Sequence, residues 1–140
     1  MQVHELEPLV GEWATEVRMP GDDEVIRGRT TFEWLEGGGY LIQRAEMEDP
    51  VFPRGVMAIG PAAGGDRVVQ HYFDSRGVAR IYEISLEDGV LRLWRDDADF
   101  AQRYSGRLSA DGSTIEGAWE ISDDGIAWRH DFDLTYRSMA

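Results

Sequence analysis

Apolar and polar residues alternate along most of this chain with a period of two, which is the pattern of β-strands that bury one face. Short acidic or glycine-rich stretches, of the kind that form tight turns, interrupt the alternation at regular intervals. Nine such connectors separate ten alternating segments; they lie at residues 21–24, 36–39, 49–53, 61–66, 74–77, 87–89, 96–99, 109–113 and 122–125. Because tight turns cannot make parallel crossovers, we expect the strands to be consecutive and antiparallel.

A sheet with this many strands usually closes into a barrel, because closure removes its unpaired edges and encloses an interior space. We therefore predict an all-β fold with a single domain over residues 1–140: a roughly ten-stranded, up-and-down antiparallel β-barrel over residues 11–138, after a lead-in at residues 1–10. In the lead-in, the near-helical spacing of Leu6 and Leu9 predicts a short helical turn. We expect this turn to plug one end of the barrel under Trp13.

In four segments the alternation distinguishes the inner face from the outer face clearly. In the last strand, aromatic and aliphatic residues alternate with charged ones, so Trp128 and His130 are expected to point inward. The segments at 26–34, 100–108 and 114–121 have similarly distinct faces, and together they predict a wide, aromatic interior. The residues of these four segments that we expect to contact a ligand are Trp34, Gln102, Tyr104, Trp119, Trp128 and His130.

The middle strands leave the choice of inner face open. In the sixth and seventh strands we favour Arg80 with Tyr82 and Arg92 with Trp94 as the inner sets, because they carry the larger aromatic rings. The opposite choice would leave an ordinary aliphatic core with the arginines in solvent. The fifth strand, residues 67–74, is equally open.

If the arginine-bearing faces of the sixth and seventh strands point inward, guanidinium groups lie beside a phenol in an apolar space. Arg80, Tyr82 and Arg92 would then bind a carboxylate or phosphate, because arginine forms bidentate bonds with such groups and an unpaired buried cation is costly. Ion pairs between these arginines and neighbouring surface carboxylates are the alternative.

The composition excludes several classes of partner and site. The net charge of −13, from 14 Lys and Arg against 27 Asp and Glu, argues against nucleic acids and anionic membranes. No apolar run is long enough to span a membrane. The chain has no cysteine, which excludes disulfides, zinc–thiolate sites and cysteine nucleophiles, and we expect a cytoplasmic protein. The paired aspartates lie in turns, so no metal site is expected.

The segment Gly11-Glu12-Trp13 places a glycine, any residue and a tryptophan at the start of the first strand, after a short helical turn. This pattern resembles the calycin superfamily, which includes lipocalins, fatty-acid-binding proteins and nitrobindin-like barrels. The resemblance implies that Trp13 packs across the barrel floor under a basic side chain from the last strand, here Arg129 or Arg137. The strand count is closer to nitrobindin and the fatty-acid-binding proteins than to lipocalins.

The stretches at 72–77, 80–83 and 128–132 resemble small uncharacterised bacterial proteins of this barrel type, loosely the domain-of-unknown-function family numbered 1579. Nitrobindin-like proteins use a histidine on a late strand as a haem ligand, and His130 occupies a comparable place. The resemblance therefore implies haem as an alternative cofactor; otherwise we predict none. An inward imidazole could also contact an organic ligand, act as a general base, or serve only the core.

Three functions follow as alternatives. The leading interpretation is a barrel that binds a small, mostly apolar or aromatic molecule, with or without an anionic head, in its interior. The second is an enzyme on the same barrel, an isomerase, cyclase or hydrolase with His130 as its base. The third is a structural module whose interior is filled solid. An apolar outer patch is also expected, which predicts a homodimer; its members would be Val68, Ile81, Leu91 and Leu93.

Overall fold

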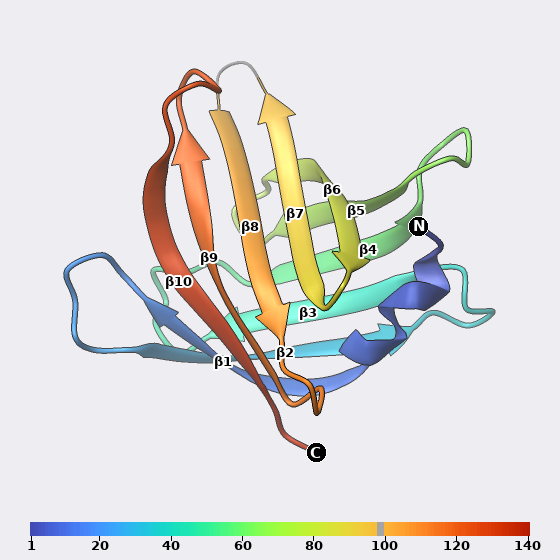
Figure 1. Cartoon of the computed structure of the whole chain (residues 1–140), viewed down its shortest axis with the longest axis horizontal. Coiled ribbons are helices and arrows are strands. Elements are labelled where there is room, and N and C mark those ends of the chain that lie inside the picture. Colours follow the sequence, from blue (N-terminus) through green and yellow to red (C-terminus); the bar gives the residue numbers. More distant parts are fainter. Residues whose placement is uncertain (98–99) are drawn as a thin grey trace.

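The computed structural model describes residues 1–97 and 100–140, and it has the predicted architecture of a closed, antiparallel barrel (Figure 1). The strands are β1 (Gly11–Arg18), β2 (Ile26–Trp34), β3 (Leu41–Met47), β4 (Gly55–Pro61), β5 (Val68–Asp74), β6 (Ala79–Glu87), β7 (Val90–Asp97), β8 (Phe100–Leu108), β9 (Thr114–Ser122) and β10 (Arg129–Ser138). Each strand pairs with its neighbours in sequence, and β10 pairs with β1 to close the barrel. The predicted connector at 96–99 lies partly outside the described residues. No helix in the described part of the chain is long and apolar enough to cross a membrane.

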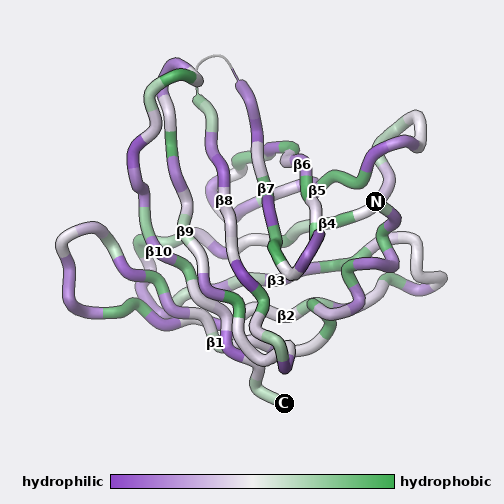
Figure 2. Tube along the Cα trace, viewed as in Figure 1, coloured by the Kyte–Doolittle hydropathy of each residue, from purple (hydrophilic) through white to green (hydrophobic). Residues whose placement is uncertain are grey.

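Hydrophobic and hydrophilic residues alternate along the strands, as a barrel with a buried inside requires (Figure 2). The predicted inner faces of β2, β8 and β9 are confirmed, since Phe32, Tyr104 and Ile115 are at most 5% exposed. The favoured inner face of β6 is confirmed as well. Its Tyr82 is 4% exposed, whereas the neighbouring Ile81 is 58% exposed.

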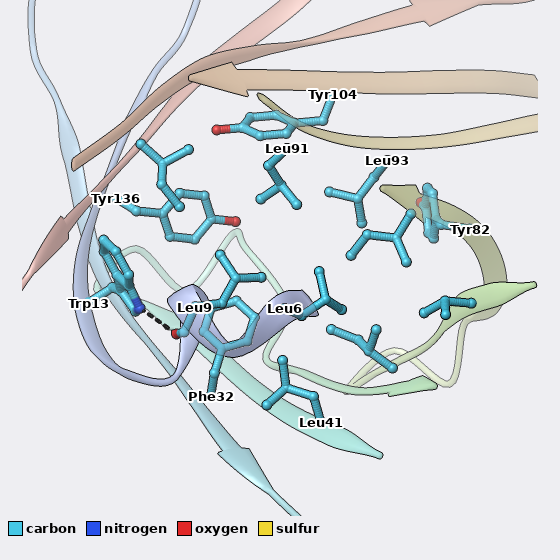
Figure 3. Packing of buried hydrophobic residues seen from close by; sticks show 14 residues of the cluster. Leu6, Leu9, Trp13, Phe32, Leu41, Tyr82, Leu91, Leu93, Tyr104 and Tyr136 are labelled. Carbon is cyan, nitrogen blue, oxygen red and sulfur yellow. Dashed lines mark hydrogen bonds between the residues drawn. The ribbon is translucent and has the colours of Figure 1, made fainter. Parts of the chain in front are cut away.

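A 3₁₀ helix, η1 (Val3–Leu9), closes one end of the barrel, as predicted. Its Leu6 and Leu9 are buried and point into the core (Figure 3). Trp13 Nε1 donates a hydrogen bond to the carbonyl oxygen of Leu9 at 2.8 Å. The Trp13 ring also meets the ring of Tyr136 edge-on, with 6.4 Å between centroids. The buried Trp13 therefore connects the helix with the floor of the barrel.

The calycin resemblance implied that a basic side chain, Arg129 or Arg137, would cover Trp13. Neither residue does so. Arg137 lies on the outer face, where its Nε is 2.6 Å from Glu16 Oε1. Arg129 pairs with Asp123 at 3.1 Å. Both are exposed and belong to ion pairs on the surface.

Two glycines facing each other across β8 and β9 make room for an interior tyrosine. Gly106 lies directly opposite Gly117. A Cβ atom on Gly117 would lie 2.3 Å from the carbonyl oxygen of Ser105 and 2.7 Å from Cζ of Tyr104. The Tyr104 ring therefore lies over the glycine pair, where any side chain on Gly117 would meet it.

The predicted inner face of β7 is wrong. Leu91 and Leu93 point into the core and are 3% and 6% exposed, whereas Arg92 is exposed and Trp94 lies half-buried on the outer face. Ring size favoured the opposite choice, but two leucines can be buried without a polar partner and a guanidinium cannot. Of the four residues predicted to form an apolar outer patch, Leu91, Leu93 and Val68 are buried. The fourth, Ile81, is exposed.

The predicted orientation of the first residues of β10 is also wrong, because a β-bulge interrupts the strand. His130 pairs with Glu120, and the next pair is Phe132 with Trp119, so Asp131 is the extra residue. The insertion reverses the alternation, and residues before it that would have faced inward now face outward. His130 is exposed, with Nε2 2.9 Å from Asp133 Oδ1.

Trp128 likewise lies outside the barrel. The guanidinium of Arg103, an exposed residue of β8, stacks on its ring at 3.9 Å from the centroid. This geometry is that of a cation–π contact at the surface.

Candidate functional site

The barrel encloses a cavity of about 230 Å³. It extends from Leu9 of η1 toward the 48–54 connection, where Phe52 and Pro53 complete its lining. Apolar side chains dominate this lining, and it includes no carboxylate or histidine from residues 1–97 and 100–140. A cavity of roughly 150 Å³ is large enough for benzene, so the interior is not filled solid and has room for a small organic molecule.

The predicted ligand contacts divide into three groups. Four of them line the cavity: Arg80, Tyr82, Gln102 and Trp119. Trp34 and Tyr104 point inward but belong to the packing around the cavity. Trp34 Nε1 donates to Glu7 Oε2 of η1 at 2.6 Å. The Tyr104 hydroxyl donates to the carbonyl oxygen of Leu134 at 3.0 Å.

The remaining predicted contacts lie outside the barrel: Arg92, Trp94, Trp128 and His130. A base or a haem ligand at His130 would therefore face solvent instead of the cavity. Its imidazole forms a surface pair with Asp133. His130 does not belong to the lining of the cavity.

One wall of the cavity carries a polar group of side chains from β6 and β8. The Tyr82 hydroxyl donates to Gln102 Oε1 at 2.6 Å. Burial raises the pKa of Tyr82, and the neighbouring guanidinium of Arg80 opposes that rise. Tyr82 is therefore neutral at physiological pH, and its oxygen lies close to a positive charge.

Among the residues that the structure describes, Arg80 is the only charged side chain that lines the cavity. Its guanidinium carbon lies 5.2 Å from the centre of the Phe100 ring and 6.0 Å from that of Tyr72. Within residues 1–97 and 100–140 it forms no ion pair with a carboxylate. Within the described chain, the direct partners of this guanidinium are therefore aromatic faces and the phenol of Tyr82.

A second polar pair lies on β3 and β5, and it was not predicted from the sequence. Gln70 Nε2 donates to Gln43 Oε1 at 3.1 Å, and both side chains are buried. Burial raises the pKa of the nearby Tyr136 to about 12, although a hydrogen bond with Gln43 opposes the shift. The alternation that starts at Leu41 places Gln43 on the inner face, so its period-two position was the signal that could have found it.

The turn between β5 and β6 positions Tyr72 at the cavity. The Tyr72 hydroxyl donates to Asp74 Oδ2 at 2.6 Å, and Arg76 Nη2 lies 2.6 Å from the same oxygen. Arg76 holds the pKa of Asp74 well below its usual range, while burial and then Asp74 raise the pKa of Tyr72. The Asp74 side chain is 0% exposed. This hairpin turn, predicted as such, therefore fixes the orientation of a ring that lines the cavity.

The arrangement is suited to binding more than to acid–base chemistry. The titratable groups that the described part of the chain contributes to the lining are tyrosines, whose pKa values are raised by burial where a shift is resolved, and one arginine. None of these groups exchanges a proton readily near neutral pH. Amide, phenol and guanidinium groups can instead bind an oxygen-bearing end of an apolar molecule.

Comparisons with known proteins agree with the fold. The chain resembles the crystal structure of Rv2717c from M. tuberculosis, with 13% sequence identity, a TM-score of 0.67, and 99% of this chain and 97% of that chain covered. No family model matches the chain, and no curated protein matches it either. The nitrobindin, fatty-acid-binding and unknown-function resemblances thus gain no support from sequence. The likeness to Rv2717c establishes a shared ten-stranded antiparallel β-barrel fold.

Proposed function

We propose that this barrel binds a small, mostly apolar or aromatic molecule in its cavity, with an anionic end at Arg80. The single observation that carries the proposal is the cavity itself, which is lined by apolar side chains and one cation without a carboxylate partner in the described chain. Ligand sites in proteins have this composition: a largely apolar lining with a few convergent polar groups.

The charge of Arg80 favours a carboxylate over a neutral polar group. A guanidinium binds carboxylate oxygens through two parallel hydrogen bonds, and such bonds are about twice as strong as neutral ones. Tyr82 and Gln102 lie beside it and can complete the hydrogen bonding of the bound oxygens. The aromatic rings of Tyr72 and Trp119 would contact the apolar part.

The proposal is tested by isothermal titration calorimetry with 2-naphthoate and with its neutral carboxamide. We expect 2-naphthoate to bind at least about tenfold more tightly, which corresponds to about 1.4 kcal/mol. Arg80→Met should remove this preference by weakening the carboxylate alone. Arg92→Met, which removes an arginine on the outer face, is the matched control and should bind both molecules as the parent does.

Two results would contradict parts of the proposal separately. If neither compound binds, and a wider set of aromatic and aliphatic acids also fails, the barrel is not a binding protein for such molecules. If both compounds bind and Arg80→Met leaves their ratio unchanged, the cavity binds apolar molecules without an anion site at Arg80.

A further inference from the structure

The wall of the barrel is not hydrogen-bonded over its whole height. The ladder between β6 and β7 ends where Glu83 lies opposite Trp94. Both strands continue beyond this pair, since β6 still pairs with β5 at Ala79 and β7 still pairs with β8 at Asp97. Figure 1 shows β7 running upward while β6 turns away behind it. A side opening therefore separates the far ends of these two strands.

A groove of about 690 Å³ lies over this opening on the outside of the barrel. Its lining comes from β5, β6 and β7. The apolar part includes Phe73, Ile81 and Trp94, and the carboxylates of Glu83, Asp96 and Asp97 belong to the lining as well. Phe73 and Ile81 are 52% and 58% exposed, and both belong to this one groove. The groove therefore presents apolar surface to solvent beside a gap in the wall.

Arg80 connects the groove with the cavity, because it belongs to the lining of both. Its guanidinium stacks toward Phe100, the first residue of β8, and Arg95 approaches the same ring from β7 at 5.8 Å. Arg95 is paired with Asp97 at 3.0 Å. Side-chain stacking thus spans the opening where backbone hydrogen bonds between β6 and β7 have ended, and side chains can move aside more easily than a ladder can open.

We propose that the opening between β6 and β7 is the doorway of the cavity, and that the groove is the outer approach to this doorway, which the apolar end of the ligand leaves when it enters the cavity. The ligand is an amphiphilic anion that first places its apolar end against Phe73 and Ile81. That end then passes Arg80 into the cavity, and the anionic group stays at Arg80 in the doorway. The inference rests on the ligand-binding function proposed above.

The chain offers a clean test because it has no cysteine, so one introduced cysteine can be modified selectively after folding. Ile81→Cys places it at the edge of the groove. Val51→Cys places it on the 48–54 connection, at the end of the cavity that is the rival entrance; Val51 is 76% exposed. Each folded protein is labelled with a polyethylene-glycol maleimide. The association and dissociation rates of 2-naphthoate are then measured by stopped-flow fluorescence.

We expect the label on Ile81→Cys to slow both association and dissociation by about tenfold or more, with Kd within about twofold of the unlabelled protein. The label on Val51→Cys should leave both rates unchanged. Parallel slowing of the two rates identifies an obstructed route, since a damaged site would change Kd.

Other outcomes overturn the doorway. Slowing by the label on Val51→Cys alone would place the entrance at the end of the barrel. Unchanged rates in both labelled proteins, or a change of Kd without slower association, would exclude the side opening as the route. If unlabelled protein does not bind 2-naphthoate or related acids, the proposed function fails, and the doorway fails with it.

Discussion

At the scale of single residues, Asp74 is a charged group that several hydrogen bonds hold in place. Its buried carboxylate accepts hydrogen bonds from Tyr72, from the Arg76 side chain and from the Arg76 backbone N–H at 2.9 Å. Because these partners lower the folded-state pKa below the unfolded value, ionised Asp74 stabilises the fold above about pH 4. This stabilisation is lost as the pH falls through the folded-state pKa.

Asp74→Asn should therefore lower the free energy of unfolding by about 1–3 kcal/mol near neutral pH. The difference from the parent should shrink as the pH falls below about 4, where the parent begins to lose the same contribution. Urea unfolding across this pH range measures it. Asp66→Asn, at an exposed turn position, is the control. A difference that stays constant down to the acid limit would show that the Asp74 charge does not stabilise the fold.

The candidate site could be predicted in part at this scale. Period-two alternation placed Gln102 and Trp119 inside correctly, because each lies in a strand with one distinctly apolar face. Arg80 and Tyr82 were also placed correctly, although ring size was a weak reason, since the same reason misplaced Arg92 and Trp94. In β7 both faces have large side chains, and ring size was the wrong criterion, because burying a guanidinium is costly whereas burying a leucine is not.

At the scale of secondary-structure elements, the β8–β9 pair depends on small residues facing each other. Gly117→Ala would bring a methyl group against the Ser105 carbonyl oxygen and the Tyr104 ring, at 2.3 Å and 2.7 Å in the present geometry. Backbone at this distance cannot move aside cheaply, so we expect a loss of about 1–3 kcal/mol in the free energy of unfolding. The displaced tyrosine should also weaken ligand binding, because its ring contacts Trp119 in the cavity wall.

Chemical denaturation measures the free energy of unfolding of Gly117→Ala, and Gly39→Ala is the control variant. A methyl group on Gly39 would have no neighbour within 4 Å, so that variant should stay within about 0.5 kcal/mol of the parent. Equal stability of the two variants would mean that β8 and β9 separate to accept a side chain, contrary to the close approach seen here.

Element boundaries were more predictable than element faces. Glycine and aspartate mark the turns directly, because they supply the backbone conformations and hydrogen bonds that turns need. The bulge in β10 has no such marker. It inserts Asp131 into a segment whose alternation looks regular, and it reverses the sides of Trp128 and His130. The residue pattern alone therefore predicted a histidine in the interior that the folded strand places in solvent.

At the scale of the whole molecule, the excess of negative charge should limit stability. The 27 acidic residues outnumber the 14 basic ones by 13, and nine arginines already form ion pairs with carboxylates in the described chain. Added sodium chloride screens both these pairs and the repulsion among the remaining carboxylates. Most of the pairs are exposed and contribute about 0–1 kcal/mol each, so the repulsion should dominate.

We expect Tm to rise between low and physiological ionic strength, as measured by circular dichroism at neutral pH, and the rise to disappear near the isoelectric point. A fall in Tm with salt at neutral pH would show instead that the ion pairs across the outer face stabilise the barrel more than its net charge destabilises it.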